Sequence, residues 1–377
     1  MPVDWFQLPG PLSFLEGLER DVRDGKSVAL LRPLQVSGDL AAEVHRRVAD
    51  SYVWTLWPGP RDDPWTPFYG QWESQLPARD RVTAADVYKL PGFSGRIIWV
   101  DPIPPKAEHA WWPFLEAFAA ASRYEDTTSR TMFVVSGSAQ QFGKGPANDL
   151  HLVTRTWDDS VSCADMSCYA YQCTAHGATC PLLRNLKACI CAELAKWDRE
   201  LCEQLSRLSV EQLVAPPVPE LAQIGRSRQW ESVKAGSPEA LLWDQGVVHS
   251  QDGQPQTHSC WLALQGDTAA LARRVWNAQV TVLFPHIEQE RVRILEGFQR
   301  YFLPLPVAGG GKEFGSIYDL ELGEMDRLLC VRGKAPQRLR RHVRTLKKIR
   351  NALAHMDVVP PEYLCPSVLK PDLSGLA

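Results

Sequence analysis

The first 155 residues alternate short apolar runs with polar segments. Two of these segments, 39–52 and 109–123, have the composition and spacing of helices. The apolar runs predict buried β-strands at residues 27–34, 96–105, 131–139 and 149–157. Strands that alternate with helices predict a mostly parallel sheet that is covered on both faces. Tryptophans beside prolines, as in LWPGP at 56–60, predict packed loops between these elements.

After residue 160 the apolar residues follow helical spacing. Residues 188–213 predict one long helix, and the prolines of 214–225 predict a linker, because proline cannot continue a helix. Residues 267–303 predict either one long helix or two helices that are separated at Pro285. His249 and His258 flank a polar turn that resembles the tip of a hairpin, and we expect both side chains to be solvated or to cap a helix.

These patterns predict an α/β N-terminal domain, with a parallel sheet like that of P-loop NTPases, and an all-α C-terminal helical bundle. Further helices are expected at residues 236–246, 321–333 and 336–356. The expected domains cover residues 1–160, 161–235 and 236–377, of which the middle one is rich in cysteine and proline. A chain of 377 residues is long enough for two or three domains.

The overall charge and the N-terminal sequence limit the classes of function. A net charge of -3 gives no general attraction to nucleic acid or membranes, so such binding would need a local patch. No apolar run approaches the ~20 residues of a membrane helix, and the N-terminus lacks the pattern of a secretory signal. We therefore expect a cytoplasmic protein with no membrane contact, whose ten cysteines are mostly thiols.

The segment PLQVSGDL, residues 33–40, joins the first predicted strand to the next helix, where a phosphate-binding loop would lie. That loop has the pattern G-x-x-x-x-G-K-[ST], whose lysine contacts phosphates and whose hydroxyl binds Mg²⁺. Here Pro33 replaces the first glycine and Gly38 retains the second. Asp39 replaces the lysine and Leu40 replaces the hydroxyl. Both charge-compensating groups are lost, so we expect no hydrolysis of a nucleoside triphosphate.

Asp101 ends the apolar strand RIIWVD, which is the place of the metal-coordinating acid in P-loop NTPases. With these features, residues 1 to about 155 resemble a degenerate, inactive AAA/STAND-type P-loop NTPase domain. The resemblance implies a domain without a cofactor that docks proteins or senses nucleotides, as in bacterial conflict and antiphage systems. The alternative is an unrelated α/β domain with the same order of strand, loop and helix.

Cysteines cluster between residues 163 and 191, where thiolates and an imidazole are suitable ligands for Zn²⁺. The cluster lacks the C-x2-C pairs of zinc ribbons, so we expect reduced cysteines that pack in the core and no metal. If zinc binds, the expected ligands are Cys168, Cys173, His176 and Cys180.

The helix predicted at 336–356 has one apolar stripe and no acid before Asp357. Two roles remain open for its basic residues, which can bind phosphates or face the acids of residues 321–326. The basic patch consists of Arg338, Arg340, Arg341, Arg344, Lys347 and Lys348.

The end of this helix, RNALAH at residues 350–355, matches the R-N-x-x-x-H motif of HEPN domains at Arg350, Asn351 and His355. HEPN domains are all-helical modules, and many are metal-independent ribonucleases. The resemblance implies that His355 transfers protons and Arg350 stabilises phosphate charge, at a site shared by a homodimer. Alternatively, Arg350 and Asn351 bond neighbouring backbone and His355 packs or caps the helix.

Together these features predict a noncatalytic regulatory or adaptor subunit of a bacterial defence system, with other protein subunits as its partners. The first alternative is a ribonuclease effector that cleaves RNA with Arg350 and His355. The second is a structural scaffold unrelated to defence. In each case the basic patch is also a candidate for binding RNA.

Overall fold

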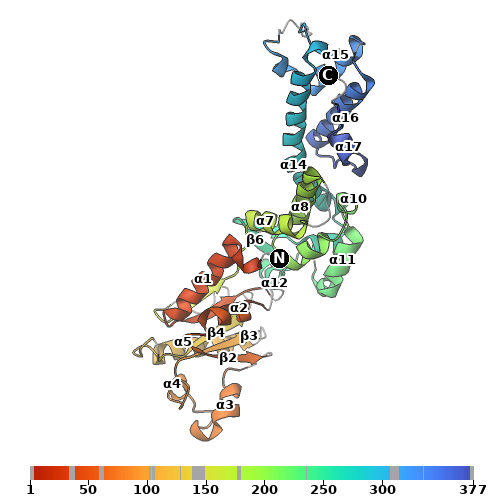
Figure 1. Ribbon diagram of the computed structural model, residues 1–377. Helices are drawn as coiled ribbons and strands as arrows, with labels where there is room; N and C mark the ends of the chain where they lie inside the picture. The colour runs from red at the N-terminus through yellow and green to blue at the C-terminus, as the bar shows by residue number, and fades with distance from the viewer. Residues whose placement is uncertain are drawn as a thin grey trace. The chain divides into compact units, whose positions relative to one another are not determined.

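The computed structural model of the protein describes residues 4–33, 39–58, 63–101, 103, 107–127, 129–137, 149–175, 180–234, 236–305, 314–333 and 335–373. The chain forms two compact units (Figure 1). The α/β unit comprises residues 4–165 and 229–258, and the helical unit comprises residues 166–228 and 259–377. The chain therefore leaves the α/β unit, returns to it once and leaves it again.

A five-stranded sheet forms the centre of the α/β unit, and all of its strand pairs are parallel. Its strands are β1 (Ser27–Leu31), β2 (Val53–Pro58), β3 (Arg96–Asp101), β4 (Met132–Gly137) and β5 (Leu152–Thr156). The spatial order is β2-β3-β4-β1-β5, so β1 lies between β4 and β5. This confirms the predicted parallel sheet of an α/β domain.

Strand β2 was not predicted, because we expected its last residues to form a loop. Val53–Pro58 instead pairs along its whole length with β3, at the edge of the sheet. Proline is compatible with this place, since an edge strand need not donate every backbone hydrogen bond. Trp57 also does not anchor a loop but packs in the core beside Phe68 and Phe133.

Helices cover the sheet of the α/β unit, which also contains a separate hairpin. The helices are α1 (Pro9–Arg23), α2 (Asp39–Val48), α3 (Thr66–Trp72), α4 (Ala84–Tyr88), α5 (Glu108–Ala121) and α12 (Glu239–Asp244), and the hairpin strands are β6 (Val248–Gln251) and β7 (Gln254–Thr257). On one face, Phe133 of β4 meets Phe114 and Phe118 of α5 in edge-to-face contacts. On the other, His45 of α2 stacks on Trp54.

The helical unit is built around the long helix α14. Its elements are α7 (Cys163–Cys173), which begins in the α/β unit, α8 (Pro181–Ala195), α9 (Arg199–Leu205), α10 (Val210–Val214), α11 (Val218–Ser227), α13 (Ser259–Leu264), α14 (Thr268–Gly297), α15 (Leu322–Val331), α16 (Gln337–Ala354) and α17 (Pro366–Leu369). Short 3-10 turns are η1 (Trp5–Gln7), η2 (Glu73–Gln75), η4 (Trp230–Ser232), η5 (Gln299–Tyr301), η6 (Ile317–Asp319) and η7 (Pro361–Tyr363). The predicted helical C-terminal part is thus confirmed.

The structure corrects two local predictions for this unit and decides a third that was left open. The segment 188–213 is not one helix, because α8 ends at Lys196, which has a positive φ of 58°, and Asp198 then caps α9. The segment 214–225 is not a linker, since α11 starts at Val218 and accepts proline in its first turn. Helix α14 continues through Pro285, which resolves the choice left open there.

Polar contacts of the buried Glu290 join α14 to α16. Arg293 Nη2 lies 2.6 Å and His342 Nε2 lies 3.5 Å from Glu290 Oε2. Burial by itself would raise the pKa of Glu290, but contacts with His342 and Arg293 outweigh it and lower this pKa to about 2. The carboxylate therefore stays charged inside the helical unit.

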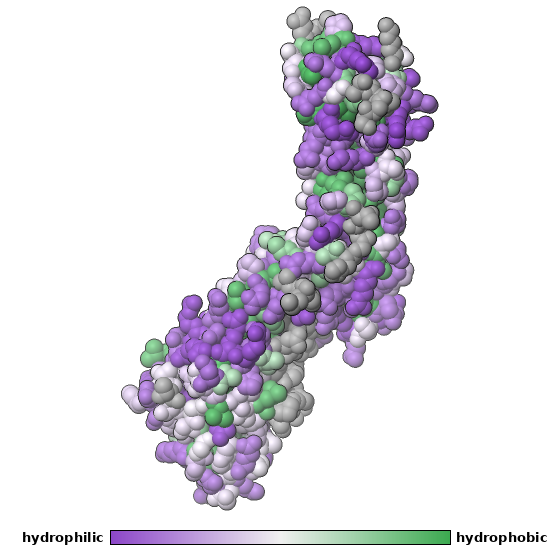
Figure 2. Space-filling view, in the orientation of Figure 1, coloured by the Kyte–Doolittle hydropathy of each residue, from purple (hydrophilic) through white to green (hydrophobic). Residues whose placement is uncertain are grey.

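Within the described ranges, no helix combines the length and the apolar character that crossing a bilayer requires. Figure 2 shows mainly hydrophilic residues on the visible face of both units, with apolar residues in small separate groups.

Candidate functional site

The carboxyl edge of the parallel sheet is the first candidate site, because α/β sheets bind ligands beyond the carboxyl ends of their strands. Arg32 follows β1 at this edge and is only 8% exposed. Its Nε donates a 2.9 Å hydrogen bond to Oγ of Ser136, in β4. The carbonyl of Ser136 accepts a bond from the N–H of Ile103, which lies beyond β3. Ser136 therefore accepts hydrogen bonds from two described protein groups at this edge.

The loop predicted between the first strand and its helix indeed joins β1 to α2. Pro33 is buried before it, Gly38 lies outside the described residues, and Asp39 is the first residue of α2. Leu40 is 1% exposed, so its side chain belongs to the core. Asp101 ends β3, as expected, but its side chain, like that of Asp39, is outside what the structure describes.

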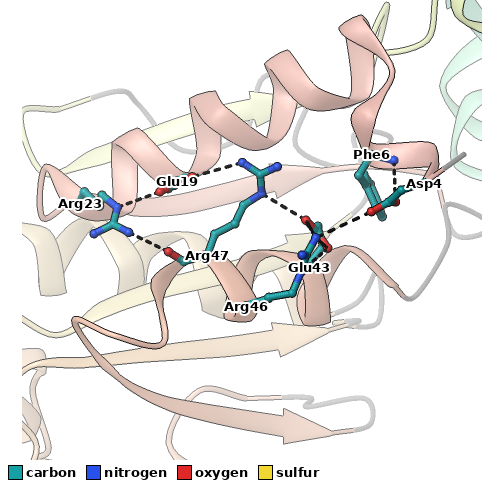
Figure 3. Close-up of polar contacts among 7 residues, drawn as sticks. All are labelled: Asp4, Phe6, Glu19, Arg23, Glu43, Arg46 and Arg47. Carbon is teal, nitrogen blue, oxygen red and sulfur yellow. Dashed lines mark hydrogen bonds and ion pairs between the residues drawn. The ribbon is translucent and has the colours of Figure 1, made fainter.

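Helix α2 is held against α1 by a network of ion pairs (Figure 3). Arg47 reaches Glu43 of its own helix at 3.2 Å and Glu19 of α1 at 3.5 Å. Arg23 of α1 bonds Glu19 at 2.9 Å and donates to the carbonyl of Arg47 at 2.7 Å. Arg46 adds a 2.6 Å contact with Glu43. The contacts between the two helices are made by Arg47, so the network holds the C-terminal part of α2 against α1.

The second candidate site lies at the C-terminal end of α16, where α14 satisfies the local backbone. Trp276 Nε1 donates a 2.8 Å hydrogen bond to the carbonyl of Leu353 in the last turn. The amide of Gln279, which is fully buried, bonds both the N–H and the carbonyl of Val359, at 2.7 and 3.0 Å. His355 caps the helix through its backbone N–H. The helix end is therefore locked by Trp276 and Gln279, which the sequence did not reveal.

The basic patch divides into a paired part and an exposed part. Arg344 Nε and Lys347 Nζ lie 3.4 and 3.1 Å from the two carboxylate oxygens of Asp326 in α15. For these two cations, the structure shows the second of the two roles left open, which is to face the acids of residues 321–326. Arg340 is half-buried. The patch residues with exposed side chains and no such pair among the described contacts are Arg338, Arg341 and Lys348.

Arg350 and His355 point to different surroundings. Arg350 Nη2 lies 3.3 Å from Glu321 Oε2, and both residues line a cleft of about 330 Å³ with Glu324, Lys347 and Asn351. His355 is exposed, and it lies about 140° around the helix axis from Arg350. One chain therefore does not direct both groups at one phosphate.

His355 instead continues the exposed basic stripe of α16. Arg341, Lys348 and His355 are spaced seven residues apart, which is about 10 Å along the helix and only about 20° around it. All three are exposed, and so is Asn351. The stripe can contact successive charges of an anionic polymer by electrostatic attraction.

The cysteine cluster does not form a described metal centre. Cys168 is exposed, Cys173 and Cys180 are half-buried, and His176 lies outside the described residues. In the part of the chain that the structure describes, no three His, Cys, Asp or Glu side chains are grouped to hold a metal.

The prediction that His249 and His258 are solvated is wrong, although the hairpin is present and His258 directly precedes α13, where a capping residue lies. They are 0% and 1% exposed. His249 Nδ1 lies 3.4 Å from Asp158 Oδ1, and burial lowers the pKa of His249 to about 4. The two histidines are buried because of a tertiary contact. Asp159 accepts a 2.9 Å hydrogen bond from the N–H of Gly253 and holds the hairpin against the loop after β5.

Comparison with known proteins gives no match to a family model, to a curated protein or to a solved structure. Arg32 and Ser136 were also missed from the sequence, where the only signal was a charged residue directly after a buried strand. Among the described residues, Arg32 and Ser136 bond each other at the sheet edge, whereas the end of α16 presents cations, an amide and an imidazole to solvent.

Proposed function

We propose that the protein is a noncatalytic regulatory or adaptor subunit of a bacterial defence system, built on an inactive P-loop NTPase-like domain. The burial of Leu40 carries this proposal. A magnesium-binding hydroxyl is needed at this position of a P-loop, whereas Leu40 is 1% exposed in the apolar core. The buried pair of Arg32 and Ser136 at the same edge of the sheet gives further support.

The strand order supports the resemblance to P-loop NTPases. The order β2-β3-β4-β1-β5 places the strand that precedes the loop between the fourth and fifth strands. AAA-type P-loop NTPases share this order. A domain with this sheet and without the cation and hydroxyl of the loop is suited to docking other subunits rather than to hydrolysis.

Ribonuclease activity of the HEPN type is the second candidate, and one observation favours it. Asn351 and His355 are exposed on the same side of α16 as Lys348 and Arg341. An imidazole beside cations can transfer a proton at a bound RNA backbone. Because Arg350 contacts Glu321 instead, this activity needs an arginine from a second copy of the chain.

Calorimetry with Mg-ATP and a phosphate-release assay test the first proposal. We expect neither binding nor turnover by the wild-type protein. The Asp39→Lys variant, which restores the loop cation, should gain measurable affinity for ATP. Hydrolysis of ATP by the wild-type protein would contradict the proposal.

Incubation with single-stranded RNA in EDTA tests the second candidate. An adaptor should leave the RNA intact at every protein concentration. Cleavage that His355→Ala abolishes, and that His109→Ala retains, would establish the ribonuclease instead. His109 is an exposed histidine of the α/β unit and serves as the matched control.

Coexpression separates an adaptor in defence from a scaffold with another role. The products of genes adjacent to its own should co-elute with the protein in size-exclusion chromatography. Loss of phage protection after deletion of this gene alone, in cells that carry the whole gene cluster, is expected for an adaptor. Unchanged protection would favour the scaffold.

A further inference from the structure

Strand β2 forms one edge of the parallel sheet, and its sequence lacks the charges that commonly protect such an edge from pairing with another chain. The opposite edge strand, β5, carries Arg155, which pairs with Asp21 of α1. Residues 53–58 read VWTLWP and contain no charge. Val53 and Leu56 are 53% and 50% exposed. Strand β2 therefore presents an uncharged, partly apolar edge.

The outward backbone groups of β2 belong to Trp54 and Leu56. The N–H of Val53 donates a 3.1 Å hydrogen bond to the carbonyl of Gly95, directly before β3. Successive residues of a strand direct their backbone groups to opposite sides. The N–H and carbonyl groups of Trp54 and Leu56 therefore point away from β3.

The next outward positions add no donor at either end of the strand. The N–H of Tyr52 already donates to the carbonyl of Val48 at 3.3 Å. Pro58 has no N–H. A partner strand at this edge can therefore accept hydrogen bonds only from Trp54 and Leu56 of β2.

A second copy of β2 matches these groups. In an antiparallel pair, two opposite residues that face each other exchange both N–H···O bonds. A two-fold axis at Thr55 places Trp54 of each copy opposite Leu56 of the other, which satisfies all outward N–H and carbonyl groups of these residues. A shifted two-fold register pairs Leu56 with Tyr52, or Trp54 with Pro58, and leaves one of their carbonyls in each copy without a donor.

The register centred on Thr55 also matches the side chains. Leu56 meets Trp54 of the other copy on the sheet face where Trp54 stacks on His45. Val53 meets Trp57 on the opposite face. Pairs of aromatic with aliphatic or β-branched residues, and of threonine with threonine, stabilise antiparallel strands. A second copy therefore supplies both the hydrogen bonds and the apolar contacts that this edge lacks.

We propose that two copies of the chain dimerise by antiparallel pairing of their β2 strands about a two-fold axis at Thr55. The two five-stranded sheets then form one continuous sheet. This inference does not rest on the proposed function. It places the contact between copies in the α/β unit, whereas the HEPN resemblance implies a contact in the helical unit.

Sedimentation velocity of the full-length protein, in reductant and over a wide range of concentration, tests the dimer. We expect the wild-type protein to change from monomer to dimer as its concentration rises. Leu56→Lys should raise the dissociation constant at least about tenfold, because it removes the Leu–Trp pairs and places like charges at the interface. Leu150→Lys adds the same charge to the α/β unit at a position that is 69% exposed, and this control should dimerise like the wild-type protein.

A disulfide between the two copies tests the register. Directly opposite residues that exchange no hydrogen bonds have Cα atoms about 4.5 Å apart, within the range of a disulfide. Thr55→Cys should therefore form a linked dimer on mild oxidation, with position 55 joined to position 55 in peptide mapping. Leu56→Cys, the matched control, places the two thiols on diagonal positions about 7–8 Å apart, too far for an unstrained bond. The wild-type chain, which has ten cysteines, gives the background.

The proposal is overturned if the wild-type protein stays monomeric at every concentration, or if Leu56→Lys dimerises as tightly as Leu150→Lys. It is also overturned if Thr55→Cys forms no link, or if Leu56→Cys links as readily. Circular dichroism verifies that Leu56→Lys is folded. The cysteine variants test the proposal independently, because their expected result is a gain of a covalent bond and not a loss of assembly.

Discussion

The carboxyl edge of the sheet and the C-terminal end of α16 each carry residues that resemble a known functional motif. These residues are buried at the sheet edge and exposed at the helix end. At the sheet edge, Leu40 is in the core and Arg32 is buried against Ser136. At the end of α16, Asn351 and His355 are exposed while Trp276 and Gln279 satisfy the nearby backbone. The first arrangement stabilises the fold, and the second leaves its side chains available to a partner.

The burial of a motif residue is therefore more informative about its role than its identity. A ligand-binding group must be accessible in at least one state, whereas a group that packs in the core contributes through apolar burial. Substitutions should therefore be costly for stability at the sheet edge and almost neutral at the helix end.

The largest effect is expected for Leu40→Asp. An unpaired carboxylate in this apolar position should lower the free energy of unfolding of the α/β unit by about 3–5 kcal/mol. Ala42→Asp adds the same charge at an exposed position of α2 and should change it by less than about 0.5 kcal/mol. Urea unfolding monitored by tryptophan fluorescence measures both. Equal effects of the two substitutions would contradict the conclusion that Leu40 stabilises the core of the α/β unit.

The two units should lose stability in different ranges of acid pH. Burial lowers the pKa of His249 from 6.5 to about 4, so the unfolded α/β unit binds a proton first and stability falls as pH drops from 6.5 to 4. Glu290, whose pKa falls from 4.5 to about 2, contributes stability to the helical unit above pH 4.5 that is lost toward pH 2. Each loss should be about 3 kcal/mol.

Hydrogen exchange at pH 7, 5 and 3, read separately in β6–β7 and in α14–α16, measures this difference. His249→Gln should reduce the loss of stability of the α/β unit between pH 6.5 and 4. Glu290→Gln should reduce the loss of stability of the helical unit below pH 4.5. The same pH dependence in both units would contradict the assignment.

A smaller effect is expected for Ser136→Ala. Removal of this hydroxyl takes away an acceptor of the buried Arg32 guanidinium and should cost about 1–3 kcal/mol. Ser74→Ala, at an exposed position of η2, is the control and should be neutral. Thermal unfolding is sufficient to compare them. A neutral Ser136→Ala would mean that the bond to Arg32 adds little to the sheet edge.

The smallest effects are expected at the end of α16. The Arg350–Glu321 pair is largely exposed, so a double-mutant cycle of Arg350→Ala and Glu321→Ala should give a coupling of about 0.2–1 kcal/mol. His355→Ala should leave stability unchanged. Denaturant titration at low and high salt measures the coupling, which should weaken with salt. A coupling above about 2 kcal/mol would place this pair in a stabilising role like that of Arg32.

The elements that depend on local pattern could be predicted, and those that depend on distant contacts could not. Strands β1, β3 and β4 follow from continuous apolar runs, and the apolar stripe of α16 follows from its spacing. Strand β2 was missed because its Trp-Pro ending is typical of loops.

The contacts that define the sites join residues far apart in the chain. The Arg32–Ser136 bond spans 104 residues and the Gln279–Val359 bonds span 80, so neither leaves a periodic signal. The burial of His249 likewise depends on Asp158, which lies in the loop after β5. The motif residues could be named from the sequence, but their accessibility required the tertiary structure.

The return of residues 229–258 to the α/β unit has a consequence for synthesis of the chain. The ribosome releases residues 166–228 of the helical unit before the hairpin that the α/β unit still needs. The α/β unit can therefore be complete only after residues 166–228 have left the ribosome, and a nascent chain stopped before residue 258 exposes an unfinished core of the α/β unit to chaperones and proteases.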